Sequence, residues 1–107
     1  MYFFVQHSSK GWILAESGKP VYTYAMDTAG KAGTCTGSCA SVWKPVEAQN
    51  PQVSSADKLP GKFSSINGQA AYNGMPLYTY APAKTLQVYP SSTWHLVPMS
   101  QSYVVSG

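Results

Sequence analysis

Short runs of alternating apolar and polar residues dominate this chain, and Gly, Pro or Asn separate most of them. In Val21–Ala25, Val21, Thr23 and Ala25 face one side of an extended strand, while the two tyrosines between them face the other. Gly and Pro interrupt helical periodicity nearly everywhere, so a single helical turn in Thr36–Trp43 is the only helix that we expect. The predicted strands are Tyr2–Gln6, Gly11–Ala15, Val21–Ala25, Val42–Trp43, Phe63–Ile66, Gln69–Tyr72, Leu77–Tyr80, Trp94–Val97 and Tyr103–Val105.

Two Asn-Gly dipeptides, Asn67-Gly68 and Asn73-Gly74, separate predicted strands in the second half of the chain. Asn-Gly favours type I′ turns because both central residues of that turn need positive φ. The second half is therefore predicted to be a meander of antiparallel strands.

One phrase occurs twice, as GKPVYTY at residues 18–24 and as GMPLYTY at residues 74–80. Each copy follows a predicted strand and precedes a tryptophan, Trp43 in the first copy and Trp94 in the second. We therefore expect an all-β protein, a small antiparallel domain built from two pseudo-repeats, arranged as a meander, as a sandwich or in a barrel-like way. The predicted division is a single domain 1–107, with a first repeat 11–46, a connector 47–62 and a second repeat 63–97.

The two tyrosines of each copy lie at positions i and i+2, so their rings share one face of a strand and can pack against tryptophan. Two interpretations stay open. The rings form a pseudo-symmetric core, or they form an exposed platform for a sugar or another planar ligand. The residues concerned are Tyr22, Tyr24, Tyr78, Tyr80, Trp43 and Trp94.

The two cysteines, Cys35 and Cys39, lie in a loop of small residues, GTCTGSCAS. Small neighbours let the two Cα atoms approach to disulfide distance, so we expect a disulfide, with a metal site or free thiols as the alternatives. A disulfide in turn indicates an oxidising compartment.

Charge is sparse: 10% of the residues are charged, the net charge is +3, and the basic residues are scattered lysines without arginine. Nucleic-acid-binding proteins usually cluster their basic residues, so we expect no nucleic-acid partner. No apolar run is long enough to span a membrane. The first residues also lack the features of a signal sequence, so an exported protein would have its signal sequence outside this chain.

The segment PVYTYAMD fits the motif Y-x-[FWY]-x-x-D through Tyr22, Tyr24 and Asp27, and CTGSCA and Trp43-Lys44-Pro45 follow it. The second half contains YNGMPLYTY and then WHLV. Over roughly residues 11–97 the chain resembles the bacterial predicted lipoproteins known as the secreted repeat of unknown function. The resemblance implies a β-rich repeat protein of the cell envelope or the exterior and implies no settled activity.

The chain departs from the family pattern in three places. Ala83 replaces the expected Asp in the second repeat, and Lys44 replaces a Pro after Trp43. There is also no amino-terminal Cys that could carry a lipid anchor.

Candidate chemistry is limited to a few side chains. Asp27 follows a strand and is expected either to accept backbone hydrogen bonds from the next loop or to contribute to a cation site. His95 is expected to be a half-exposed packing residue and His7 to have no specific role, with copper binding together with methionines as the weaker alternative. Ser residues are abundant but have no nucleophile-elbow motif.

These observations favour a non-enzymatic secreted or cell-envelope module that binds or assembles with a partner, without a cofactor. The partner would be a protein, a glycan or another copy of the chain, and the location would be extracellular, periplasmic or at the cell surface. The alternative is a copper- or iron-handling or redox protein, and a hydrolase ranks last. The possible ligand-binding residues are Tyr22, Tyr24, Asp27, Tyr78 and Tyr80.

Overall fold

The computed structural model describes residues 2–16, 18–48, 52–53, 59–83 and 87–103. The fold is mostly antiparallel β-structure, as predicted, and α1 is the predicted helical turn beside the cysteines. The elements in chain order are β1 (Tyr2–Ser8), β2 (Gly11–Glu16), β3 (Lys19–Tyr24), α1 (Ser38–Val42), β4 (Trp43–Pro45), β5 (Gln52–Val53), β6 (Phe63–Ile66), β7 (Gln69–Tyr72), β8 (Met75–Pro76), β9 (Tyr78–Tyr80), β10 (Trp94–Leu96) and the 3₁₀ turn η1 (Gln101–Tyr103).

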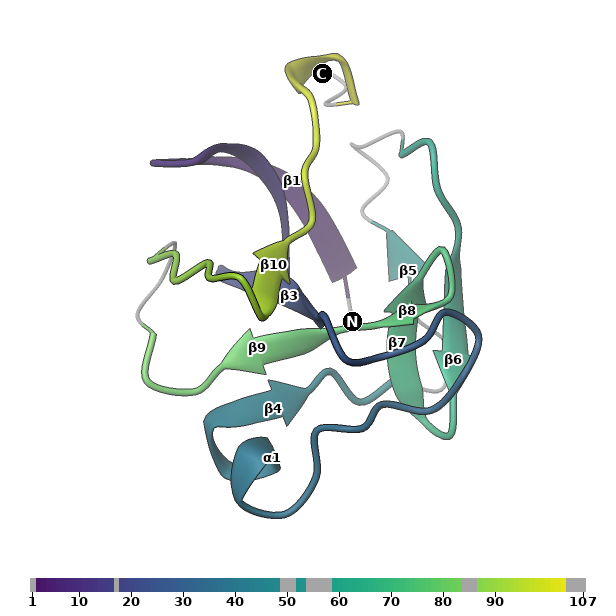
Figure 1. Ribbon diagram of the computed structural model, residues 1–107. Helices are drawn as coiled ribbons and strands as arrows, with labels where there is room; N and C mark the ends of the chain where they lie inside the picture. The colour runs from purple at the N-terminus through teal and green to yellow at the C-terminus, as the bar shows by residue number, and fades with distance from the viewer. Residues whose placement is uncertain (1, 17, 49–51, 54–58, 84–86, 104–107) are drawn as a thin grey trace.

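The strands form two sheets. The larger has the order β4-β9-β3-β2-β1-β5, and β10 pairs with β3 outside this path. The smaller contains β6, β7 and β8, which lie beside one another in Figure 1. Among the described pairings only β1 with β5 is parallel.

Both Asn-Gly turns have the predicted geometry. Asn67 and Gly68 connect β6 to β7, and Asn73 and Gly74 connect β7 to β8. All four residues have positive φ, as the two central positions of a type I′ turn require. The second half therefore contains the predicted meander.

The C-terminal strand prediction was wrong where the structure can test it. Tyr103 lies in η1, and its backbone N–H donates to the carbonyl of Ser100 at 3.0 Å, which closes a local turn in place of a strand pairing. Val104 and Val105 lie outside the described residues. Inside the predicted connector, the short strand β5 pairs with the edge of β1, a long-range contact that its polar surroundings do not predict.

The two repeats are related residue by residue around the pairing of β3 with β9. Tyr22 lies opposite Tyr78, which is its counterpart in the second copy of the repeated phrase. Val21 lies opposite Thr79 in the same pairing. The register therefore places a pseudo-two-fold axis between the two tyrosines.

The strands that carry tryptophan, called here the Trp strands β4 and β10, are exchanged between the repeats. We define unit 1 as the described residues from 2 to 48 and unit 2 as those from 59 to 99. The β4 strand of unit 1 pairs with β9 of unit 2, and β10 of unit 2 pairs with β3 of unit 1. In Figure 1, β4 accordingly lies along β9, and β10 lies along β3. Each unit thus completes the sheet of the other.

Backbone hydrogen bonds continue the exchange beyond the Trp strands. The N–H of Leu14 donates to the carbonyl of Val97 at 3.0 Å, and the N–H of Ala70 donates to the carbonyl of Val46 at 2.7 Å. These two bonds are equivalent under the pseudo-symmetry. A second equivalent pair follows, from Met99 to Trp12 at 2.8 Å and from Ala48 to Gly68 at 2.7 Å.

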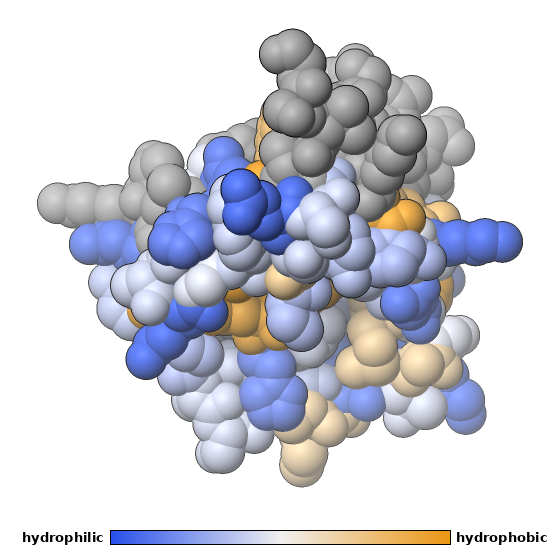
Figure 2. Space-filling view, turned by 90° about the horizontal axis from the view of Figure 1, so that it is seen from above, coloured by the Kyte–Doolittle hydropathy of each residue, from blue (hydrophilic) through white to orange (hydrophobic). Residues whose placement is uncertain are grey.

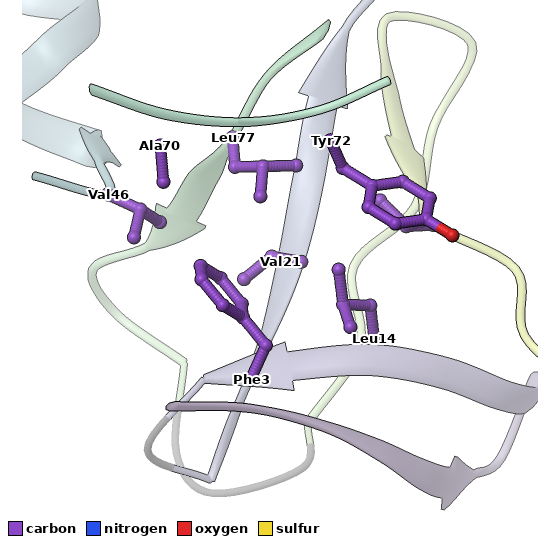
Figure 3. Close-up of a cluster of buried hydrophobic side chains, with 8 residues drawn as sticks. Phe3, Leu14, Val21, Val46, Ala70, Tyr72 and Leu77 are labelled. Atoms are coloured by element: carbon purple, nitrogen blue, oxygen red, sulfur yellow. The ribbon is translucent and has the colours of Figure 1, made fainter. Parts of the chain in front are cut away.

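The main apolar core lies between the units and contains side chains from both. Figure 3 shows them pointing toward one another from β1, β2, β3 and from the segments of unit 2. Phe3 stacks on Phe63 with ring centroids 4.4 Å apart, and these two residues hold equivalent positions in the two units. The fully or nearly fully buried members are Phe3, Leu14, Val21, Val46, Ala70, Tyr72, Leu77 and Val97.

Candidate functional site

A column of four aromatic rings, called here the aromatic stack, lies across the pseudo-two-fold axis. Trp43 and Trp94 stack at its centre with centroids 4.1 Å apart and an interplanar angle of 8°. Tyr24 covers the outer face of Trp94 at 4.3 Å, and Tyr80 covers the outer face of Trp43 at 4.5 Å. The strand of each tyrosine pairs with a Trp strand of the other unit, and the tyrosine packs on the tryptophan of that strand.

The other two motif tyrosines pack edge-on against the aromatic stack and are fully buried. Tyr22 meets Trp43 at 5.0 Å and 77°, and Tyr78 meets Trp94 at 5.1 Å and 82°. Edge-to-face and offset stacked contacts each stabilise a ring pair by about 0.5–1.5 kcal/mol beyond area burial. All six aromatic motif residues therefore belong to one cluster.

Within the aromatic stack, the faces of the tryptophan rings are in contact with other rings of the stack. Both faces of Trp43 and of Trp94 are covered by another ring of the stack. Tyr24 and Tyr80, at the two ends, are only half-buried. A planar ligand can therefore reach this cluster only at its ends.

Asp27 has only 9% of its surface exposed, and it joins unit 1 to unit 2 through its carboxylate. One oxygen, Oδ1, accepts from the backbone N–H of Thr34 at 2.8 Å and from the Thr34 hydroxyl at 2.6 Å. The other, Oδ2, accepts from the hydroxyl of the buried Tyr78 at 2.8 Å. Asp27 therefore accepts a bond from the following loop, as predicted, and also holds the central tyrosine of the other repeat.

Gly33 allows this loop to pass close to Tyr78. A Cβ atom at Gly33 would collide with the Tyr78 hydroxyl and would lie 2.9 Å from Oε1 of Gln69. The glycine is thus required by close approach rather than by its backbone angles.

In unit 2, Ala83 occupies the position of Asp27, and the turn around it is the same. The N–H of Ala83 donates to the carbonyl of Tyr80 at 3.1 Å, as the N–H of Asp27 donates to that of Tyr24 at 3.0 Å. Without a carboxylate there, the Tyr22 hydroxyl accepts from the backbone N–H of Tyr89 at 2.8 Å. Tyr22 therefore receives a backbone donor, as Tyr78 does from Cys35, but Ala83 supplies no carboxylate acceptor to its hydroxyl.

Burial raises the pKa of Tyr78 to about 12, and the hydrogen bond to the Asp27 carboxylate contributes to the rise. Hydrogen bonds from the Cys35 backbone and from Gln69 act in the opposite direction. Burial also raises the pKa of Tyr22 and of Tyr72. The charged form of all three phenols is therefore disfavoured in the folded chain.

Stability is expected to fall as the pH rises from about 10 to about 12. An unfolded tyrosine loses its proton near pH 10, whereas folded Tyr78 keeps it up to about pH 12. The folded state then binds more protons than the unfolded state in this window, so the free energy of unfolding decreases with pH. Urea unfolding between pH 9 and pH 11.5 measures the slope, which we expect to be shallower in Tyr78→Phe, with Tyr22 and Tyr72 supplying the remainder. Equal slopes in both proteins would contradict the assignment.

The predicted disulfide between Cys35 and Cys39 is present, with the two Cα atoms 5.3 Å apart. Cys35 is buried and packs within the cluster that contains Tyr22, Tyr78 and Trp94. The bridge therefore fixes the loop that carries Thr34 and Cys35 against the aromatic residues.

The histidines lie apart from this cluster. His95 is exposed, and its Nε2 lies 3.1 Å from the carbonyl oxygen of Ser92. His7 is exposed and meets Trp12 edge-on at 5.1 Å. In the part of the chain that the structure describes, no three His, Cys, Asp or Glu side chains gather as a metal site would require.

Exposed aromatic surface continues the aromatic stack at its Tyr80 end. The Tyr89 ring is 44% exposed and contacts Tyr80 at 4.9 Å. Val42 is 38% exposed, and its carbonyl accepts from the N–H of Ala81, the residue after Tyr80. We call Val42, Tyr80 and Tyr89 the aromatic rim.

Figure 2 shows the face of the molecule that is seen from above. Hydrophilic side chains cover most of it, and hydrophobic residues show only in small areas among the coloured atoms. A cleft of about 370 Å³, lined mainly by apolar residues, separates β10 from the β7–β8 hairpin. Its lining residues are Thr23, Pro60, Tyr72, Asn73, Met75, Leu96, Val97 and Pro98.

Sequence reasoning missed four residues that shape the site: Gly33, Thr34, Gln69 and Tyr89. Gly33 approaches Tyr78 of the other unit, whereas Thr34 and Gln69 lie close in sequence to the residues they contact but at no regular strand or helix spacing, so no local pattern marks them. Tyr89 lies in a segment whose sequence predicts only a polar loop. Its backbone N–H donates to the hydroxyl of Tyr22 in the other unit, a contact that the sequence of the loop does not indicate.

In the described part of the chain no helix has the length and apolar character to cross a membrane. No curated protein gives a significant match to this chain, and no solved structure does. A family model described as "secreted repeat of unknown function" matches residues 5–47, which run from β1 past β4 and include Tyr22, Tyr24, Asp27, Cys35, Cys39 and Trp43. Over residues 5–47 the chain is therefore similar to the secreted repeat family of unknown function.

Proposed function

We propose that this chain is a non-enzymatic secreted module, at the cell surface or in the periplasm, that binds a glycan through the aromatic rim. The observation that carries the proposal is the exposed ring of Tyr89, 44% accessible, which extends the aromatic stack to the surface. Buried aromatic residues alone need no ligand to explain them. An exposed tyrosine held against that column offers a ring face to a partner.

The rim is held in place by buried groups. The backbone N–H of Tyr89 donates to the hydroxyl of Tyr22, which has no exposed surface. Tyr80 packs on Trp43, which stacks on Trp94. A binding surface that is ordered before the ligand arrives loses less conformational entropy on binding.

The chemistry of the rim fits a sugar ring. One face of a pyranose carries C–H groups, which can pack on an aromatic ring, while the hydroxyl groups at its edge need hydrogen-bond partners. The Tyr89 hydroxyl donates to Oε1 of Gln87 at 3.2 Å, so a polar pair borders the exposed ring. Both residues are exposed to solvent.

A titration with pyranose oligosaccharides, including N-acetylglucosamine oligomers and maltohexaose, tests the proposal. Tryptophan fluorescence is the readout because Trp43 contacts Tyr80 of the rim. We expect a saturable change, with an affinity reduced by about tenfold or more in Tyr89→Ala, a loss of about 1.4 kcal/mol. Phe4→Ala is the matched control, since Phe4 is an exposed aromatic residue of β1 outside the rim.

Two results would count against glycan binding at the rim. One is the absence of a saturable change with every sugar of the panel. The other is an equal loss of affinity in Tyr89→Ala and Phe4→Ala, which would place the binding elsewhere.

A further inference from the structure

Each unit is structurally incomplete without a Trp strand from outside it. In unit 1, one edge of β3 is occupied by β10, and the residues after β10 bond to β2. In unit 2, the corresponding positions beside β9 and β7 are taken by β4 and the residues after it. In each unit, two strands thus have an edge that is paired with the Trp strand of the other unit or with the residues after it.

The contacts that join the units are reciprocal and noncovalent. The disulfide lies within unit 1, so only the connector between Ala48 and Leu59 links the units through the chain. The pairings of β3 with β10 and of β9 with β4 are the same contact made twice around the axis. This is the arrangement of a strand-exchanged dimer whose two subunits are connected.

Nothing in these contacts depends on the two units being in the same chain. The connector raises the effective concentration of one unit near the other, and it thereby favours pairing within the chain at low protein concentration. Exchange of identical elements between chains is a common route to dimers when a hinge is constrained.

We propose that the unit-to-unit surface is an interaction site for a second copy of this chain. Unit 1 of one copy pairs with unit 2 of another, and the remaining two units pair in the same way. Each of the two resulting bodies contains the full aromatic stack. The partner is thus recognised by its Trp strand, with Trp43 or Trp94 inserted between the rings of the recipient.

A shortened connector tests the proposal in the otherwise complete chain. Deletion of residues 54–58 joins Val53 of β5 directly to Leu59, which packs against the core from the side of unit 2. Each deleted residue removes up to about 3.3–3.6 Å of reach, so pairing within one chain is disfavoured relative to exchange between chains. Light scattering after size-exclusion chromatography is expected to give twice the mass of the shortened chain, with near-UV circular dichroism like that of the parent. A folded monomer with the parent spectrum would overturn the proposal.

A complementation experiment covers the case in which the shortened chain does not fold. Trp43→Ala changes a residue of the strand that unit 1 donates and leaves the sequence of unit 2 intact, and Trp94→Ala changes a residue of the strand that unit 2 donates and leaves the sequence of unit 1 intact. When the two full-length variants are unfolded and refolded together, unit 1 of the Trp94→Ala chain can pair with unit 2 of the Trp43→Ala chain. We expect a two-chain species in which one body unfolds at the temperature of the parent protein.

The controls are each variant refolded alone and a mixture of folded variants without the unfolding step. Neither is expected to show the parental transition. If the co-refolded mixture unfolds as the sum of the two separate variants and contains only monomers, exchange between chains does not occur. This outcome is independent of sugar binding at the rim, because Tyr89 takes no part in the exchanged strands.

Discussion

Trp94→Ala is expected to lower the free energy of unfolding by about 3–5 kcal/mol, the usual cost of truncating a buried tryptophan. Trp94 is 7% exposed, and its two faces are covered by Tyr24 and Trp43. Its edge contacts the buried Tyr78. The substitution removes all three ring contacts at once and leaves a cavity on the pseudo-two-fold axis.

Urea unfolding followed by far-UV circular dichroism measures this loss, with Trp12→Ala as the control. Trp12 is half-buried on β2 and has one edge-on ring contact, with the exposed His7. Its truncation should therefore cost clearly less than that of Trp94. If the two variants were equally stable, the aromatic stack would not be a major stabilising contact between the units.

Asp27→Ala is expected to cost about 3 kcal/mol, because hydrogen bonds to a charged group are worth about 1.5–3 kcal/mol and an unsatisfied buried donor costs about 1–3 kcal/mol. The substitution leaves the hydroxyl of buried Tyr78 and the N–H and hydroxyl of Thr34 without their acceptor. Asp27→Asn should cost less, since the amide oxygen still accepts from one of these partners.

Glu47→Ala is the control for the loss of a carboxylate, because Glu47 is exposed. Its effect should stay within about 0.5 kcal/mol, as for most surface substitutions. The measurement is again the free energy of unfolding in urea at pH 7. A cost for Asp27→Ala as small as that for Glu47→Ala would show that the carboxylate does not hold the two units together.

The features that could be predicted from the sequence are those with a local cause. Positive φ at Asn-Gly fixes two hairpins, small residues between the cysteines permit the bridge, and alternation around Tyr22 places a strand. The repeated phrase also indicates that Tyr22 and Tyr78 are equivalent. Each of these inferences needs only residues that are close in sequence.

The exchange of the Trp strands could not be predicted in this way. A strand can pair with the tyrosine strand of its own unit or with that of the other, and the apolar pattern is identical in both cases. The same limit applies to Asp27, which belongs to a motif in unit 1 but accepts a hydrogen bond from Tyr78 of unit 2. At the C-terminus, the β-forming residues around Tyr103 favour a strand, whereas a local bond to Ser100 closes a turn.

Backbone nuclear Overhauser effects measured on the native protein test the exchange of strands most directly. The structure predicts contacts between Trp94–Leu96 and Tyr22–Tyr24, and between Trp43–Pro45 and Tyr78–Tyr80. If each unit instead kept its own Trp strand, the contacts would link Trp43–Pro45 to Tyr22–Tyr24 and Trp94–Leu96 to Tyr78–Tyr80. Observation of the first set supports the exchanged fold, and observation of the second set would contradict it.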